Sequence, residues 1–359
     1  MFYPHRRQKA SHLLAKLELD ALVFCKPENI RYLCGFTGSD GVLILFSDRL
    51  VFLTDSRYTT QSHEEVTADQ VCQYTSKTDG IADQLSSHNV MRIGFEATLP
   101  FGFVKELQSK GDEGWHWQHL KDELETLRLH KSADEIDLLA KAAELNALAF
   151  DDIIEMVKPG AREIDVAIAL EFALRKHGAE EKAFDFIVAS GPRGALPHGV
   201  ASEKLIGANE LVTIDFGCRW SGYHSDETVT LATGAVSDEL KSIFDTVLEA
   251  HDRALEAVAS GVELAELDRI ARDYIKSRGF GDYFGHGLGH GVGLEIHEAP
   301  TVSSRSTMTA EAGMVITVEP GIYLPDVGGV RIEDTVVVTD AGHHLLTKIP
   351  KTFSRSLLN

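Results

Sequence analysis

The chain has 359 residues, of which 43% are hydrophobic and 25% charged, and its formal net charge is −20. This charge would repel a phosphate backbone, and no basic stripe offsets it, so we expect no nucleic-acid partner. The longest apolar runs, such as residues 41–46, have the length of a strand rather than the roughly 20 residues of a membrane span, so we expect no membrane partner.

The amino-terminal segment reaches Glu18 and Asp20 before any apolar stretch of signal-peptide length. Four cysteines lie far apart and form no C-x-x-C pair, which is typical of reduced thiols. These two features predict a cytoplasmic protein.

Residues 1–125 alternate helix-like and strand-like segments. Residues 5–20 are amphipathic, and strands are expected within residues 21–26, 41–55 and 91–97. This alternation predicts an α/β amino-terminal domain.

The pattern changes between about residues 120 and 131, so we expect a second domain over residues 126–359. Ser132 followed by Glu135 forms a capping box that starts a long helix. Further helices are expected over residues 163–178, 237–261 and 263–279, between pairs of strands. This second domain is therefore expected to be α+β.

Two hairpins in the second domain each carry two acidic residues. In the first, the Ser221-Gly222 turn signal separates two strand patterns and predicts that Asp215 lies opposite Asp226. In the second, a connection rich in Pro and Gly predicts that Glu319 lies opposite Glu333. Four carboxylates would thus face one another in pairs.

Opposed carboxylates need compensation, because two such charges at about 4 Å repel by on the order of 4 kcal/mol even at an effective dielectric near 20. Protonation could supply it, as in an acid–base dyad, and each acid taken alone could be an ordinary solvent-facing strand residue. Two matched pairs near the histidine-rich segment 285–298 favour a site for two divalent cations.

Four segments, in this order and spacing, resemble the signature of the pita-bread metallopeptidases. They are "DFGCRWSGYHSDETVT", "GHGLGHGVGLEIHE", "TVEPGIY" and "GGVRIEDTVVV". That family includes aminopeptidase P, prolidase, methionine aminopeptidase and the metal-free creatinases. The amino-terminal half, through "ENIRYLCGFTGSDG" and "VFLTDSRYTTQ", is similar to the creatinase-type first domain, which favours the proline-specific branch.

The resemblance implies five metal ligands: Asp215, Asp226, His290, Glu319 and Glu333. Asp226 and Glu333 would each contact both metals, Asp215 would complete one site, and His290 with Glu319 the other. Glu319 would also handle the proton of the attacking water. Mn²⁺ or Co²⁺ is the usual ion in such enzymes, and Zn²⁺ also binds.

Other site residues follow from the same resemblance. His297, with His198 as its partner, would hydrogen-bond the scissile carbonyl as it becomes an oxyanion, and His286 would face the substrate. His198 and His286 could instead simply hydrogen-bond loop carbonyls. Arg331 and Tyr323 would form a link with Asp215 that fixes the ligands, although Arg331 could instead be a surface cation. Where the family often has Arg, this chain has Val229, so a contact behind the ligands is expected to be missing.

The resemblance implies removal of an amino-terminal residue that precedes proline. Longer peptides, the substrates of aminopeptidase P, are preferred here over the Xaa-Pro dipeptides of prolidase. The choice depends on the loops that cap the cleft and on whether a cation reads the free carboxylate of a dipeptide. A homodimer is also expected. A creatinase-like C–N hydrolase and a non-enzymatic binding protein are more remote alternatives, since such proteins lack the full ligand set.

Overall fold

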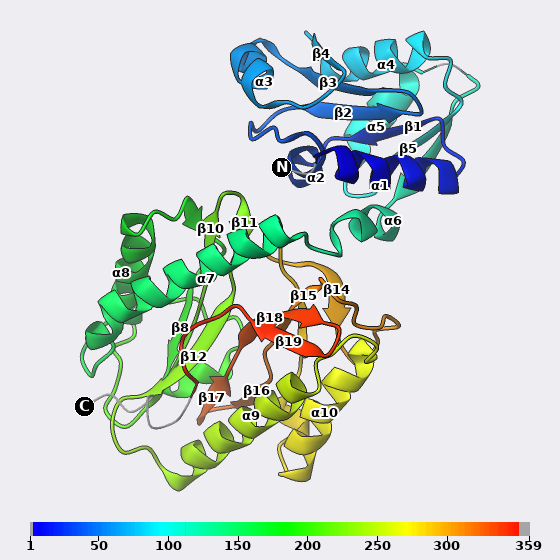
Figure 1. Ribbon diagram of the computed structural model, residues 1–359. Coiled ribbons are helices and arrows are strands. Elements are labelled where there is room, and N and C mark those ends of the chain that lie inside the picture. Colours follow the sequence, from blue (N-terminus) through cyan, green and yellow to red (C-terminus); the bar gives the residue numbers. More distant parts are fainter. Residues whose placement is uncertain (1–2, 112, 352–359) are drawn as a thin grey trace. The chain divides into compact units, whose positions relative to one another are not determined.

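The computed structural model describes residues 3–111 and 113–351. The chain divides into two compact units, Met1–Arg128 and Leu129–Asn359 (Figure 1). Within the described residues, every helix is too short or too polar to cross a membrane.

The first unit is built on a six-stranded mixed sheet in the order β4-β3-β2-β1-β5-β6. Its strands are β1 (Ala21–Phe24), β2 (Val42–Phe46), β3 (Leu50–Thr54), β4 (Gln70–Gln73), β5 (Arg92–Glu96) and β6 (His116–Leu120). Its helices are α1 (Tyr3–Lys16), α2 (Pro27–Cys34), α3 (Thr59–Glu65), α4 (Lys77–Ser87), α5 (Phe101–Ser109) and α6 (Asp122–Glu125). The expected strands and the α/β class are confirmed. The continuous apolar runs of β1, β2 and β3 are explained by their burial at every position.

The second unit begins with the predicted capping box. The Glu135 carboxylate accepts hydrogen bonds from both the backbone N–H and the hydroxyl of Ser132, each at 3.0 Å, and a third from the Tyr223 hydroxyl at 2.8 Å. The helices of this unit are α7 (Ala133–Ile153), α8 (Glu163–Lys176), α9 (Asp238–Glu256) and α10 (Leu264–Ser277). All four expected helices are present.

The strands of the second unit form several sheets, of which three carry site residues: β12-β9-β8, β14-β13-β15-β18-β19 and β16-β17. In chain order the strands are β7 (Glu181–Lys182), β8 (Ile187–Ser190), β9 (Leu211–Phe216), β10 (Cys218–Trp220), β11 (Tyr223–His224), β12 (Glu227–Ala232), β13 (Gly289–Gly291), β14 (Glu298–Val302), β15 (Val315–Val318), β16 (Gly321–Leu324), β17 (Gly328–Arg331), β18 (Asp334–Thr339) and β19 (Gly342–Leu345).

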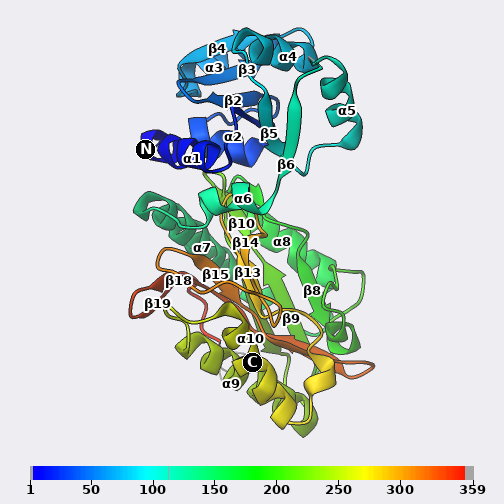
Figure 2. The same cartoon turned by 90° about the vertical axis from the view of Figure 1, so that its right-hand side faces the viewer.

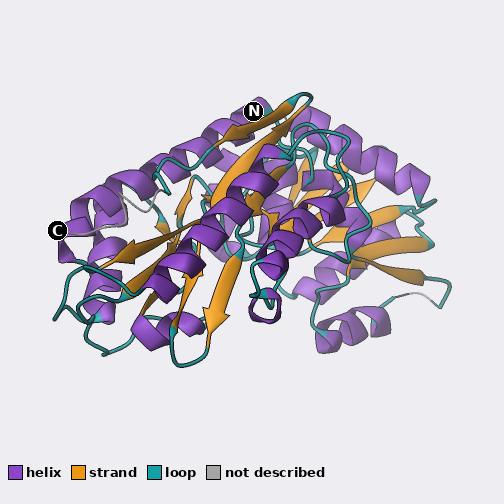
Figure 3. Cartoon of the chain, turned by 90° about the horizontal axis from the view of Figure 1, so that it is seen from below, coloured by secondary structure: helices purple, strands orange, loops and turns teal. Residues whose placement is uncertain are grey.

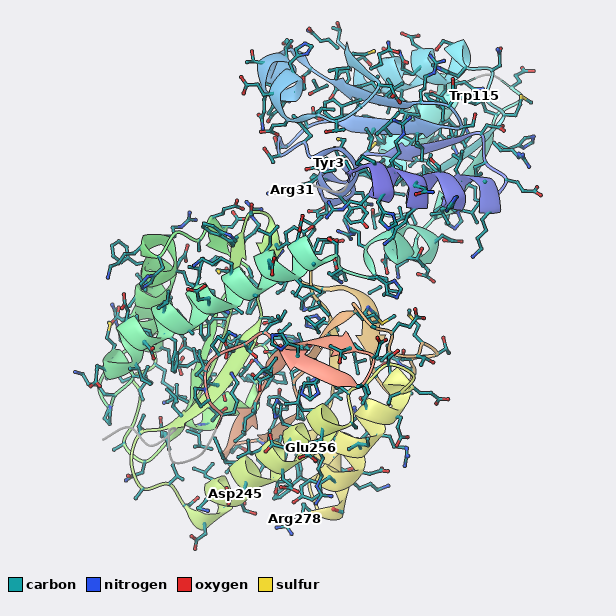
Figure 4. The ribbon with its side chains drawn as sticks, viewed as in Figure 1. Tyr3, Arg31, Trp115, Asp245, Glu256 and Arg278 are labelled. Carbon is teal, nitrogen blue, oxygen red and sulfur yellow. The ribbon has the colours of Figure 1, made fainter. Side chains whose placement is uncertain are left out.

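This unit has two cores of similar design. In one, α7 and α8 pack on β8, β9 and β12 through residues such as Leu145 and Ile214. In the other, α9 and α10 pack on β15 and β18 through residues such as Val247 and Ile316. Figure 2 shows α9 and α10 on one side of these strands, and Figure 3, seen from below, shows helices in front of strands. Polar positions of α9, including Asp245 and Glu256, are exposed on its outer side (Figure 4). Each half is thus a helix pair covering one side of three central strands, β8-β9-β12 or β13-β15-β18.

The register of the first hairpin differs from the prediction by two residues. The Ser221-Gly222 turn is present, with both residues at positive φ, but Asp215 pairs with Thr228 rather than with Asp226. Asp226 lies just before β12. It would fall opposite Gly217 if the register continued, two positions along from Asp215. Because side chains two apart on a strand point to the same side, the two carboxylates still share one face.

The second hairpin has the predicted register. Val318 pairs with Asp334 and Gly321 with Arg331, so Glu319 and Glu333 occupy opposite positions. Neither residue belongs to a strand, because the pairing is interrupted on both sides there. Their backbone N–H groups instead donate to Leu288 and to Thr228 respectively. These backbone bonds place Glu319 beside the segment before β13 and Glu333 beside β12.

Candidate metal centre

A cleft of about 810 Å³ lies in the second unit, and all ten residues singled out in the sequence line it. They are His198, Asp215, Asp226, His286, His290, His297, Glu319, Tyr323, Arg331 and Glu333. They come from β9, β13, β16, β17 and the segments that adjoin them. His198 and Glu333, which are 135 positions apart in the chain, thus line the same cleft.

The centre of the cleft is a cluster of metal-type donors. Asp226, His290 and Glu333 each offer a ligand atom, and these atoms all lie within 4.8 Å of one another. His290 Nε2 is 3.6 Å from Asp226 Oδ2 and 3.3 Å from Glu319 Oε1. Four of the five expected ligands therefore surround a common volume.

The His290 ring is oriented by the backbone of the next residue in β13. Its Nδ1 lies 3.1 Å from the carbonyl oxygen of Gly291, to which Nδ1–H can donate. This bond leaves the lone pair of Nε2 facing the carboxylates. A histidine held in this way has the tautomer that binds metal ions in proteins.

Asp215, the fifth expected ligand, is held from behind. Its Oδ2 accepts a 2.5 Å hydrogen bond from Arg331 Nη2, and both side chains are buried. Its Oδ1 is buried and makes no hydrogen bond to the part of the chain that the structure describes. A buried carboxylate oxygen left without a donor is costly, and a cation in the cleft would satisfy it.

The electrostatics of the cluster also fit divalent cations. Burial raises the pKa values of Asp226 and Glu333 well above the usual range, and the neighbouring carboxylates raise them further. Burial would also raise the pKa of Glu319, but the hydrogen bond and charge of His290 outweigh it and lower this pKa to about 2. The carboxylates of the cluster carry more negative charge than the buried Arg331 guanidinium can balance, so the donor set fits further positive charge.

The predicted link among Asp215, Arg331 and Tyr323 is present. Arg331 Nη1 donates to the Tyr323 hydroxyl at 2.9 Å, while Nη2 holds Asp215. Arg331 is therefore not the surface cation considered as an alternative, since its side chain is only 4% exposed.

His286 lines the cleft, and both of its ring nitrogens contact the protein. Its Nε2 is 2.8 Å from the Tyr323 hydroxyl, and its Nδ1 is 2.8 Å from the carbonyl oxygen of Gly287. Burial lowers the pKa of His286, so the ring is neutral and its two nitrogens are both engaged by the protein. His286 lines the cleft, but it extends the chain of bonds from Asp215 rather than presenting a free nitrogen to a substrate.

His198 and His297 do present free nitrogens. Neither ring makes a hydrogen bond within residues 3–111 and 113–351, and both line the cleft. The His297 ring packs edge-on against His290, with centroids 4.3 Å apart. Burial and the nearby rings of His290 and His198 lower the pKa of His297. Both rings are therefore available to a substrate.

The expected defect at Val229 does not reach the cleft. Val229 lies on the face of β12 that packs against Phe150 and Phe216 in the α7–α8 core. Its neighbours Thr228 and Thr230 face the other way and contact Glu333 and the backbone of Arg331. Strand alternation thus removes residue 229 from the ligand side altogether.

Several supporting residues were missed in the sequence. Thr228 donates to Glu333 at 2.7 Å and Thr317 to Glu319 at 3.1 Å. Each threonine is two residues from an expected ligand, so strand alternation could have found it. Asp268 and Arg272 of α10 anchor the loop before His290 through the carbonyls of Phe284 and His286 and the N–H of Leu288. No sequence pattern indicated this anchor.

Comparison with known proteins identifies two domains. Residues 6–130 match the Creatinase/Prolidase N-terminal domain, and residues 137–340 match metallopeptidase family M24. The chain is 38% identical to the Xaa-Pro dipeptidase of Pyrococcus horikoshii over 343 residues, which cover 95% of this chain and 96% of that protein.

Solved structures agree with these matches. The structure of an Xaa-Pro dipeptidase from Bacillus anthracis superposes with a TM-score of 0.96 at 40% identity, over 99% of this chain and 100% of that one. An X-Pro aminopeptidase from Thermotoga maritima gives a TM-score of 0.88 at 35% identity, over 97% and 98%. The five-ligand cleft and these matches together lead to one conclusion: the chain belongs to metallopeptidase family M24 and carries the creatinase/prolidase type of amino-terminal domain.

Proposed function

We propose that this protein is an Xaa-Pro dipeptidase that uses two divalent metal ions to hydrolyse the bond between an amino-terminal residue and proline. The observation that carries the proposal is the convergence of Asp226, His290 and Glu333 on one volume of the cleft, with Asp215 and Glu319 beside it. The named relatives and structural neighbours that act on Xaa-Pro bonds support the substrate class.

The metal ions would be held by Asp215, Asp226, His290, Glu319 and Glu333. We propose Mn²⁺ as the ion, with Co²⁺ and Zn²⁺ as alternatives, since oxygen ligands with a single imidazole suit all three. When bound, the ions supply Lewis acidity and lower the pKa of water.

The protein's own groups have separable tasks. Glu319 lies beside His290 and is proposed to accept the proton of the attacking water. His297 and His198 have free nitrogens at the cleft and are proposed to donate to the scissile carbonyl oxygen as negative charge develops on it. Arg331, Tyr323 and His286 keep Asp215 in place through their chain of hydrogen bonds.

Proline explains why a dedicated enzyme is needed. Its ring fixes φ, and its nitrogen carries no N–H, so a peptidase that binds an extended, N–H-donating residue after the scissile bond fails on it. An open cleft lined by imidazoles and by Pro197 and Val200 has no such requirement.

The position of Arg305 supports dipeptides rather than longer peptides as the substrates. It is exposed, lines the same cleft and has no ion-pair partner among the described residues. It is therefore the cation that could read the free carboxylate of an Xaa-Pro dipeptide. The similarity to an X-Pro aminopeptidase keeps longer peptides as the second candidate, which the sequence had favoured.

The test compares hydrolysis of Ala-Pro and Ala-Pro-Ala by metal-depleted protein given Mn²⁺. Cleavage of Ala-Pro with little action on the tripeptide is expected, and the reverse would establish the aminopeptidase. No metal-dependent cleavage of either would contradict both. The R305M variant should raise KM for Ala-Pro by about ten- to a hundredfold, the worth of a hydrogen bond to a charged group.

We further propose that the enzyme is a cytoplasmic homodimer. Its four cysteines form no disulfide, which is typical of proteins of this compartment. Light scattering during gel filtration tests the dimer, with a mass near 39.4 kDa indicating a monomer instead.

A further inference from the structure

A second pair of acids lies directly behind the candidate metal centre. Glu227 is the first residue of β12 and Asp334 the first residue of β18, and each follows an expected ligand, Asp226 or Glu333. The two strands approach each other here, because Glu333 N–H donates to the Thr228 carbonyl at 3.2 Å and the Thr335 hydroxyl to the Asp226 carbonyl at 2.8 Å.

These two contacts place Glu227 opposite Asp334. Since side chains alternate along a strand, both acids point away from the face that carries Asp226 and Glu333. Both are buried, and neither lines the cleft. The two halves of the unit thus present the same arrangement, a ligand toward the cleft followed by an acid on the reverse side.

Lys351 lies between the two reverse-side acids. Its Nζ is 2.5 Å from Glu227 Oε1 and 3.5 Å from Asp334 Oδ1, and the three side chains are only 6%, 0% and 7% exposed. The segment leading to it is tied to the same acids, because the Thr347 hydroxyl donates to Asp334 and the Ile349 N–H donates to Glu227.

Buried like charges require such a partner. Burial would lower the pKa of Lys351, but Glu227 and Asp334 outweigh it, so the ammonium is retained. His251 also contacts this group, with its Nε2 3.3 Å from Asp334 Oδ2. Removing one member of such a buried group leaves uncompensated charge.

We propose that Lys351 is a positioning residue of the metal centre, which ties the starts of β12 and β18 together from behind and so sets the separation of Asp226 and Glu333. This inference rests on the proposed function, because it assumes that the cleft binds divalent metal. Residues behind metal ligands typically change metal affinity by about 10- to 100-fold.

The test is a titration of the metal-free full chain with Co²⁺, followed by visible absorption, for the wild type, K351M and K348M. Lys348 lies three residues earlier and is exposed, so K348M removes the same charge from the same segment. We expect K351M to bind Co²⁺ at least about tenfold more weakly, with an altered absorption spectrum, and K348M to match the wild type. Wild-type affinity and spectrum in K351M would overturn the proposal, even if its Tm fell.

The double variant E227Q/K351M separates positioning from charge balance and serves if K351M does not fold. It removes one acid with the lysine, so it avoids the uncompensated charge yet still lacks the tie. Co²⁺ affinity that stays at least about tenfold below the wild type supports positioning, whereas full recovery contradicts it. A wild-type protein that bound no Co²⁺ would instead refute the proposed metal centre itself.

Discussion

The Thr228 hydroxyl donates a 2.7 Å hydrogen bond to Glu333 Oε2, joining the β9–β12 half of the second unit to the β17–β18 half. The same hydroxyl oxygen accepts from Arg331 Nε at 3.3 Å, and Thr228 pairs with Asp215. One small side chain therefore orients two expected ligands, one directly and one through Arg331.

Replacing Thr228 with Val should weaken metal binding. The volume is preserved, but Glu333 loses its donor, so we expect metal affinity to fall by about tenfold and stability by about 1–3 kcal/mol. Isothermal titration with Mn²⁺ and urea unfolding measure the two effects. T246V, on the α9 helix, removes a hydroxyl that bonds only within its own helix, and it should leave Mn²⁺ affinity unchanged; an equal loss there would contradict the assignment.

The Y323F variant should break the chain between His286 and Arg331. Both hydrogen bonds of the hydroxyl are lost, so the buried Arg331 loses one acceptor and the half-buried His286 Nε2 loses its partner. We expect kcat for Ala-Pro to fall by about tenfold or more, corresponding to about 1–3 kcal/mol for an unsatisfied buried group. Steady-state kinetics at saturating Mn²⁺ measure this change. Unchanged kcat would show that Arg331 holds Asp215 without help from the tyrosine.

Metal removal should lower stability because the buried carboxylates then lose their compensating charge. At a free ion concentration of 100 times Kd, one bound ion stabilises the fold by about 2.7 kcal/mol. Differential scanning calorimetry with EDTA and with Mn²⁺ should therefore show a lower transition temperature in EDTA. The D226N variant, in which the shared ligand is neutralised, should show a much smaller difference. A metal-independent transition in the wild type would count against the ion-binding role of the cluster.

The cysteines should differ in how fast they react with a thiol reagent at a given pH. Burial raises the pKa of Cys34 to about 12 and that of Cys218 to about 11, so at pH 8 both are thiols, and the reactive thiolate appears only as pH rises toward these values. Cys72 is partly exposed. Labelling of native protein with a disulfide reagent at pH 8 should modify Cys72 well before Cys34 or Cys218, and C72S should lose this fast phase. Rapid labelling of Cys218 in C72S would contradict its burial.

Much of the fold follows from local patterns in the sequence. The Ser132–Glu135 capping box, the amphipathic periods of α8 to α10 and the Ser221-Gly222 turn are short-range features, and each appears where the pattern indicated. The predicted pairing of Asp215 with Asp226 was wrong because these two residues are not equally distant from the Ser221-Gly222 turn. Trp220 pairs with Tyr223 across the turn, and the same register continues to Asp215 and Thr228, so the position of the turn already gives the correct partner. The prediction that Glu319 lies opposite Glu333 was correct because both strands are interrupted at the same level, so the register is the same before and after the interruption.

The metal ligands could be predicted from the resemblance to a known family, whereas most of the residues that hold these ligands in place could be identified only from the structure. Thr317 is within reach of the alternation rule, but Lys351 and Arg272 come from segments far from the site in sequence. The engagement of His286 by Tyr323 likewise depends on how two loops meet. Long-range side-chain contacts of this kind have no signature in a single sequence.

The division of the second unit into two similar helix-and-strand halves has a further consequence. Asp215 and Asp226 belong to the half with α7 and α8, and Glu319 and Glu333 to the half with α9 and α10. Each half carries only part of the expected ligand set, so ions bound at the proposed centre would cross-link the two halves. Separation of the halves would then release the ions, and the affinity for metal would report on the docking of one half against the other.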